Sequence, residues 1–172
     1  MSMAWRPPLL LLAAAGAVFL FRPATALEFG NAGRGIVARY PVKTGDAFSI
    51  TYRHSIYLQP VVEEFSVGPG GKLVLTGVRS ESGAVLEYFG FSDSRPLHAM
   101  NRPMRTIVFR VAVEGAQTLT LGGRRISFLS LGDPGDRITL RLADDSLAAR
   151  GAGWAASRIR RLQPFARTWR RQ

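Results

Sequence analysis

The strongest constraint in this chain is the close spacing of its turn signals. Between residues 33 and 143, clusters rich in glycine, proline and aspartate recur at short intervals, and apolar residues alternate with polar ones between them. A period of two is typical of a strand with one buried face. The pattern predicts about eight short strands, at 35–42, 47–54, 60–67, 72–78, 106–114, 118–121, 125–129 and 136–142, with 85–89 as a weaker candidate.

Strands at this spacing favour an all-β fold, either an antiparallel β-sandwich or a partly open barrel. No long helical period separates them, so parallel βαβ units have no room. The longest stretch without a pattern, 92–105, contains Pro96 and Pro103 and is expected to be irregular. A length of 172 residues fits one such domain, which we place at 27–149.

The first 26 residues have the order of a secretory signal peptide. Arg6 supplies a positive charge, an uncharged apolar run covers 9–21, and Ala24-Thr25-Ala26 is a small-x-small cleavage site. The apolar run is shorter than the ~20 residues that span a bilayer, although an uncleaved membrane anchor is the alternative. The chain has no cysteine, which suits a periplasmic protein with an adequate core. We therefore expect export to the periplasm.

The charge of the chain is concentrated at its C-terminal end. The formal net charge is +11, but residues 150–172 contain seven arginines and no acidic residue, which leaves 27–149 nearly neutral. The tail has an interfacial pattern at helical spacing, and we expect either an amphipathic helix on an anionic membrane or acidic partner, or a flexible extension. Its expected contact residues are Trp154, Arg158, Arg160, Arg161, Phe165, Trp169 and Arg170.

Several function classes are excluded or disfavoured by composition and compartment. Without cysteine, the chain has no disulfide framework, cysteine-ligated zinc or iron–sulfur site, and no cysteine nucleophile. No phosphate-binding P-loop and no dinucleotide fingerprint occurs. Export makes a nucleic-acid partner unexpected despite the basic charge. We predict no cofactor.

Most polar chemistry falls in one predicted hairpin. His54 shares a strand face with Phe48, Ile50 and Tyr52, and Glu63 shares a face with Val61. If both faces are buried, the imidazole and the carboxylate enter the core side by side and pair. Such a pair either fixes the 55–60 loop or belongs to a small ligand pocket formed by Arg53, His54, Ser55 and Glu63.

Catalysis or metal binding by the same residues is less well supported. Ser55 follows His54 directly, so the two side chains point to opposite faces of a strand, and no GxSxG nucleophile elbow occurs. A metal site would need His54 and His98 to converge with Glu63 or Asp93, without the short ligand spacing of zinc sites. We therefore predict no catalytic residue and no metal ligand.

The hairpin also resembles a known family. Tyr52, His54 and Ser55, followed by Pro60, Val61 and Glu63, are similar to the motif of a small bacterial family known only as a domain of unknown function (number 1850). Its members are short exported proteins, typically encoded beside TRAP transporters of the TAXI type. The resemblance covers about 27–143, and it implies an accessory role in the uptake of organic anions.

Two hypotheses of function follow. In the first, the domain is a non-enzymatic periplasmic module that binds the solute-binding protein, the membrane subunit of a TRAP transporter or a small anionic solute. In the second, it is a small envelope hydrolase, with His54 as general base and Glu63 orienting it. The first is favoured because the sequence holds no nucleophile or metal constellation.

Overall fold

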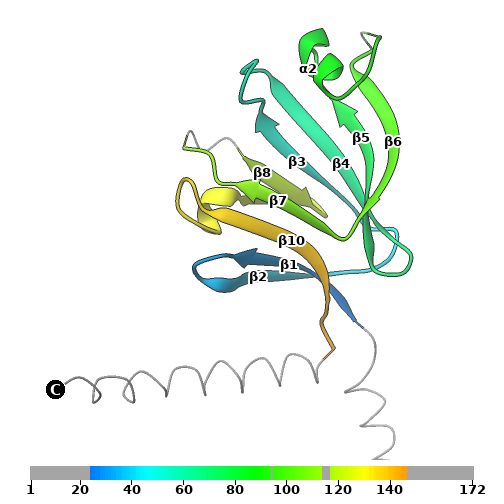
Figure 1. Ribbon diagram of the computed structural model, residues 1–172. Coiled ribbons are helices and arrows are strands. Elements are labelled where there is room, and N and C mark those ends of the chain that lie inside the picture. Colours follow the sequence, from blue (N-terminus) through cyan, green and yellow to red (C-terminus); the bar gives the residue numbers. More distant parts are fainter. Residues whose placement is uncertain (1–23, 94, 114–116, 147–172) are drawn as a thin grey trace, which may run out of the picture. The chain divides into compact units, whose positions relative to one another are not determined.

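The computed structural model describes residues 24–93, 95–113 and 117–146, and residues 25–143 form one unit that carries both sheets of the fold. Residues 1–23 of the expected leader and the expected tail at 150–172 lie outside the described residues. Every described strand pairs into one of two sheets, of four and six strands, which lie against each other as an open sandwich (Figure 1).

The smaller sheet has the strand order β2-β1-β10-β7. Its strands are β1 (Thr25–Asn31), β2 (Gly35–Val42), β7 (Thr106–Arg110) and β10 (Arg137–Asp144). The hairpin of β1 and β2 and the pair of β10 and β7 are both antiparallel, and Phe109 lies opposite Ile138. In this sheet β7 is an edge strand, with β10 as its single neighbour among the described strands.

The larger sheet has the order β6-β5-β4-β3-β8-β9, and its pairs are antiparallel. Its strands are β3 (Ala47–Arg53), β4 (Pro60–Gly68), β5 (Lys72–Arg79), β6 (Leu97–Met104), β8 (Thr118–Leu121) and β9 (Arg124–Ser127). A short helix α2 (Gly83–Tyr88) lies between β5 and β6, and a 3-10 turn η1 (Phe128–Ser130) follows β9.

One residue joins the two sheets at their edges. β6 ends at Met104 in the larger sheet, and β7 begins at Thr106 in the smaller one, with Arg105 between them. The chain therefore turns from one layer into the other almost without a loop, as Figure 1 shows at the lower right of the sheets.

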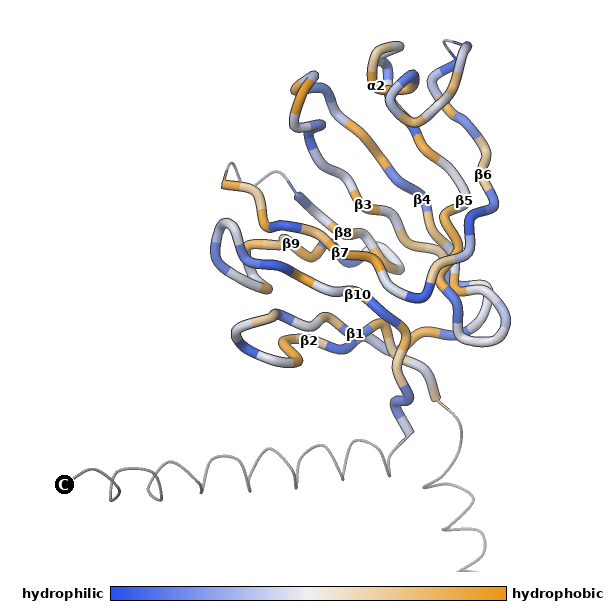
Figure 2. The backbone as a smooth tube through the Cα atoms, viewed as in Figure 1, coloured by the Kyte–Doolittle hydropathy of each residue, from blue (hydrophilic) through white to orange (hydrophobic). Residues whose placement is uncertain are grey.

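The core forms where the two sheets face each other. Apolar residues alternate with polar ones along the strands (Figure 2), and the inward side chains are almost fully buried. Phe48 and Phe65 stack across β3 and β4 with ring centroids 5.0 Å apart. Burial of such side chains contributes ~1.5–3 kcal/mol each. The largest of them are Phe29, Phe65, Phe128, Leu27, Ile50, Leu73, Leu86, Leu119, Ile138 and Leu140.

The expected all-β class is confirmed, with corrections to its elements. The predicted strand 106–114 ends at Arg110, and the predicted strand 125–129 ends at Ser127, where the 3-10 turn η1 follows. The candidate strand at 85–89 is wrong, because the chain forms helix α2 there, which begins after the extended Ser82 and ends before Gly90 at φ 88°. Segment 97–104, expected to be irregular, is strand β6. Pro103 cannot donate a ladder hydrogen bond, and an edge strand tolerates this.

Strand β1 was not predicted, and it begins at Thr25, inside the expected leader at 1–26. Its burial pattern has no period of two, because four consecutive residues, 26–29, are buried. None of the described helices is both long and apolar enough to span a membrane.

Candidate functional site

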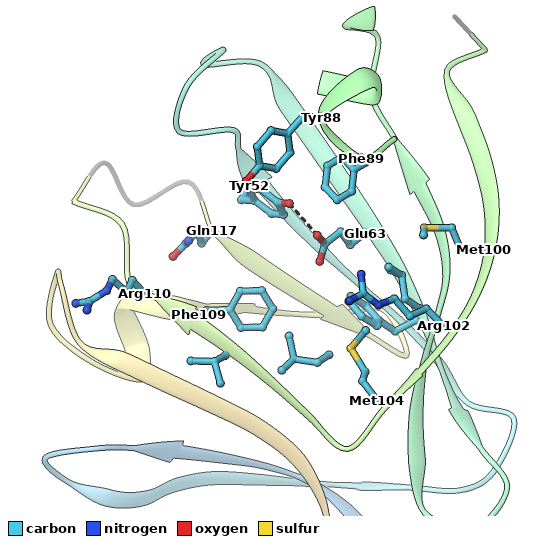
Figure 3. Close-up of a pocket in the computed structure, with 14 residues that line it drawn as sticks. Tyr52, Glu63, Tyr88, Phe89, Met100, Arg102, Met104, Phe109, Arg110 and Gln117 are labelled. Atoms are coloured by element: carbon cyan, nitrogen blue, oxygen red, sulfur yellow. Dashed lines mark hydrogen bonds between the residues drawn. The ribbon is translucent and has the colours of Figure 1, made fainter. Parts of the chain in front are cut away.

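A groove runs between β7 of the smaller sheet and the strands β3 to β6 of the larger one (Figure 3). Its first hollow has a volume of about 600 Å³. Apolar and aromatic side chains form most of the wall, with one carboxylate, two guanidinium groups and one amide. The lining residues are Tyr52, Glu63, Phe65, Leu75, Tyr88, Phe89, Met100, Arg102, Met104, Ile107, Val108, Phe109, Arg110 and Gln117. We call this site the inter-sheet groove.

The carboxylate at the centre of the groove is Glu63 of β4. Alternation along β4 places it on the same face as the buried Val61 and Phe65, so a charged group takes an apolar position. Its neighbours on the adjacent strands are also apolar, Ile50 on β3 and Val78 on β5. Glu63 is therefore held half-buried without a cation beside it in the ladder.

Tyr52 of β3 supplies the polar partner of Glu63. Its phenol Oη donates a hydrogen bond to Glu63 Oε1 at 2.9 Å. Burial raises the pKa of Glu63, and the hydrogen bond from Tyr52 offsets only part of that rise. Burial, the charge of Glu63 and this hydrogen bond raise the pKa of Tyr52 as well, so the phenol stays protonated. The pair is a neutral donor beside a carboxyl group whose charged form is disfavoured.

The groove continues into a second hollow of about 610 Å³ toward the β3–β4 loop. Four residues line both hollows: Tyr52, Tyr88, Arg110 and Gln117. The second hollow adds Arg53, His54, Ser55, Leu58, Val111, Ala112 and Val113. Three of the four residues expected to form a ligand cluster therefore line this hollow, whereas Glu63 lines the first.

His54 does not contact Glu63 as expected. Its Nδ1 accepts hydrogen bonds from the backbone N–H groups of Ile56 and Tyr57, at 3.3 and 3.4 Å. The Tyr57 ring stacks on the imidazole and the Tyr88 ring meets it edge-on, with centroids 5.2 and 4.7 Å away. The expected His54–Glu63 pair is thus corrected to a Tyr52–Glu63 pair, because the strand ends at Arg53 and His54 turns into the loop.

The loop after β3 is held by its own polar groups. Arg53 donates from Nε and Nη2 to the Leu58 carbonyl at 3.2 and 3.1 Å, and the Leu58 N–H donates to the His54 carbonyl at 2.8 Å. Leu58 has a φ of 53°, the left-handed region that bulky residues rarely adopt. Ser55 is exposed at this loop, and Pro60 accepts a hydrogen bond from Ser80 Oγ. These contacts fix the loop beside the second hollow.

Sequence reasoning missed the half of the groove contributed by α2, β6 and β7. Tyr88 and Phe89 come from a segment predicted as a strand, and Arg102 comes from the segment predicted to be irregular. Arg110 lay in a predicted strand, but nothing in the sequence connected it with Glu63. In Figure 3 Arg102 and Arg110 lie on opposite sides of the hollow, with Phe109 between them.

The described residues contain no group of three or more histidine, aspartate and glutamate side chains that could hold a metal ion. His98 and Asp93, two candidate ligands in the sequence, lie together outside the two hollows, with His98 Nε2 3.4 Å from Asp93 Oδ1 and the imidazole stacked on Phe91. His54 and Glu63 have the separate partners given above.

Comparison with known proteins yields no relative: the chain matches no family model, no curated protein and no solved structure. The tail residues expected to contact a membrane or partner, Trp154 to Arg170, lie outside the described residues. The inter-sheet groove is therefore the feature on which a function can be argued.

Proposed function

We propose that the protein is a non-enzymatic periplasmic module that works with a TAXI-type TRAP transporter of organic anions, and that the inter-sheet groove is its binding surface. The observation that carries the proposal is the groove itself. An open hollow of about 600 Å³, in which apolar and aromatic side chains surround a few charged and amide groups, is typical of a binding site.

The charges in the groove favour an anionic group on whatever binds there. Arg102 and Arg110 line it, and Glu63 is its single acidic lining residue. Burial disfavours the charged form of Glu63, so its repulsion of an anion is reduced. A protonated Glu63 could also donate a hydrogen bond to a carboxylate. This agrees with the uptake of organic anions that the family resemblance implies.

The hydrolase alternative required His54 and Glu63 to act as a pair. His54 Nδ1 is occupied by two backbone N–H groups, and Glu63 is bound by Tyr52. A general base needs a partner that orients it and a nucleophile within reach. No contact of these side chains favours that function.

Capture of transporter components tests the proposal. The full-length protein, carrying an affinity tag, is isolated from a strain that co-expresses the membrane subunit and the solute-binding protein of a TAXI-type system. We expect one of these two components to co-purify. The double variant Arg102→Gln/Arg110→Gln should capture at least tenfold less of that component.

Arg125→Gln is the matched control, because Arg125 is an exposed arginine of β9 and does not line the groove. Its capture should equal that of the unchanged protein. The proposal is wrong if neither component co-purifies and deletion of the gene leaves organic-anion uptake intact. It is also wrong if purified protein hydrolyses ester or phosphoester substrates and His54→Ala abolishes that turnover.

A further inference from the structure

The edge of the smaller sheet opens directly onto the inter-sheet groove. β7 is hydrogen-bonded to β10 on one side, and its other edge has no strand neighbour among the described residues. Four consecutive residues of β7, 107–110, line the first hollow. Side chains of consecutive strand residues point to opposite faces. All four can line one hollow only if the hollow follows the edge of the strand.

The second hollow extends this edge. Residues 111–113 follow β7 directly, and together with Arg110, the last residue of β7, they line it in the same consecutive manner. Together the two hollows run along residues 107–113, of which 107–110 are strand and span ~10 Å at ~3.3 Å per residue, while 111–113 continue as coil and turn. Two hollows that follow seven consecutive residues of the chain match an extended segment of a partner better than one small solute.

The backbone of β7 presents hydrogen-bonding groups to this space. The Val111 N–H donates to the Asp136 carbonyl at 2.9 Å, and the Val111 carbonyl accepts from Gly135 at 2.8 Å, so residue 111 faces the β10 side. The direction alternates along an antiparallel strand. The N–H and C=O groups of Val108 and Arg110 therefore point away from β10, toward the open edge.

The charges around the edge select the partner. Arg105 and Arg110 bracket β7, and Arg102 lines the groove from β6. A second copy paired antiparallel on β7 would bring Arg105 and Arg110 of both molecules together, and like charges across strands are destabilising. An extended segment with acidic residues at its ends would instead place carboxylates beside these arginines.

We infer that the inter-sheet groove binds an extended, acid-flanked segment of a partner protein by β-strand addition to β7. This inference rests on the proposed function, since it names the kind of partner that the same groove takes. Main-chain hydrogen bonds to 108 and 110 give the affinity, and alternate apolar side chains enter the groove between Phe109 and Met100. The two flexible methionines of the wall, Met100 and Met104, can adapt to different side chains.

The test uses the full chain and a defined probe. The probe is a fluorescein-labelled decapeptide with Glu-Glu at both ends and alternating Val and Thr between them, measured by fluorescence anisotropy. We expect saturable binding, and binding weaker by about tenfold or more, equivalent to ~1.4 kcal/mol, for the same peptide with Lys-Lys ends. A peptide N-methylated at alternate central residues should also lose about tenfold, because it cannot pair with a strand edge.

Variants of the edge complete the test. Val108→Pro removes an N–H that points away from β10, so the β7–β10 ladder is kept while peptide binding should fall about tenfold. Val108→Ala retains the N–H and removes only part of a lining side chain, so its loss of binding should be clearly smaller than that of Val108→Pro. Arg110→Glu should shift preference toward the Lys-ended peptide. If Val108→Pro does not fold, the N-methylated peptide gives the same information on the ligand side.

The possible results distinguish failure of the strand-addition inference from failure of the proposed function. Equal binding of the N-methylated and unmodified peptides overturns strand addition. A concentration-dependent dimer in analytical ultracentrifugation that is lost in Val108→Pro overturns the partner segment in favour of a second copy. Binding of succinate without the peptide overturns this inference and leaves the proposed function standing. If Val108→Pro captures as much of the transporter component as the unchanged protein does, strand addition is likewise overturned and the proposed function stands.

Discussion

Two glutamates in inner strands of the two sheets have opposite surroundings. Glu28 of β1 is flanked by arginines on both neighbouring strands: Arg39 of β2 lies opposite it and donates from Nε at 2.8 Å, and Arg141 of β10 donates from Nε at 2.8 Å. Glu63 of β4 has Ile50 and Val78 in the corresponding places. Glu28 thus has two arginines beside it in the smaller sheet, whereas Glu63 has no cation at its paired positions in the larger one.

The pKa values of the two carboxyl groups follow this difference. Burial raises the pKa of Glu28, but hydrogen bonds from Arg141 and Arg39 and their charges outweigh it, so the net pKa is lowered. Burial dominates for Glu63, and its pKa is raised. A glutamate compensated by its own ladder supports the fold, whereas one left with a neutral partner is available to a ligand. The following changes test this comparison.

Removal of the Glu28 carboxylate should have the largest effect. Glu28→Ala leaves the guanidinium groups of Arg39 and Arg141 together without an anion, and we expect a loss of about 2–3 kcal/mol in the free energy of unfolding. Both arginines are partly exposed and recover some hydration, which limits the loss. Urea denaturation at pH 7 measures it, with Arg125→Ala as the control for loss of an exposed β-strand charge. A loss below 0.5 kcal/mol would contradict the structural role of Glu28.

Tyr52→Phe should have a smaller effect on stability and a specific effect on Glu63. It removes one partly buried hydrogen bond, which is worth ~1 kcal/mol. Since the hydrogen bond from Tyr52 lowers the pKa of Glu63, its loss should raise that pKa further. A ¹³C NMR titration of the Glu63 carboxyl group measures the shift, and Tyr57→Phe is the matched control. An unchanged Glu63 titration would show that the contact in the groove is not formed in solution.

Glu63→Gln should change stability by less than about 1 kcal/mol, and with the opposite sign to Glu28→Ala. Glutamine keeps an acceptor for the Tyr52 hydroxyl and has no charge to desolvate. Because the folded pKa of Glu63 is raised, its ionisation costs stability as the pH rises through and above 4.5. The free energy of unfolding of Glu63→Gln should therefore rise relative to that of the unchanged protein as the pH increases from 4 to 7.

Glu28→Gln should show the reverse dependence. The folded pKa of Glu28 is lowered, so its stabilising contribution is complete above 4.5 and is lost as the pH falls through the folded pKa. The difference between Glu28→Gln and the unchanged protein should shrink in acid. Thermal midpoints from pH 3 to 7 compare both variants, and parallel curves would contradict the contrast between the two carboxyl groups.

The smallest expected effect on stability comes from a comparison of two turns. The β1–β2 turn uses Gly35 at φ 79°, whereas the β3–β4 loop beside the groove holds Leu58 at φ 53°. Asparagine tolerates the left-handed region, so Leu58→Asn should raise the free energy of unfolding by about 0.5–1 kcal/mol. Urea denaturation checks this, with the exposed Leu97→Asn as control. A destabilising Leu58→Asn would show that the exposed leucine makes contacts that outweigh its backbone strain.

The sequence predicts strands well where turn residues bound an alternating run. The predicted 35–42 and 118–121 coincide with β2 and β8, because glycines fix the adjoining turns. Strand β1 has four consecutive buried residues, so it has no alternation to detect. Strand β6 lies at an edge with five of its eight residues exposed, and Pro103 disguises it further. Tertiary context, not local pattern, makes these two segments strands.

The site was predictable in part. Tyr52 and Glu63 were both identified from the hairpin, because their strands are adjacent in sequence and their faces follow from alternation. The partner of Glu63 could not be predicted, because it depends on where β3 ends and on the turn of His54 into the loop. Arg102 and Arg110 join the groove across two sheets. A single sequence contains no signal for that proximity.

The one-residue connection at Arg105 has a mechanical consequence. β6 and β7 form opposite walls of the groove, and the chain passes between them through Arg105 alone. Any widening of this side must be absorbed by a few backbone torsions at that joint, while the ring of Pro103 fixes φ on the β6 side. A change in the width of the groove on this side would therefore act through the backbone of Arg105, and it would not by itself require either sheet to lose a hydrogen bond.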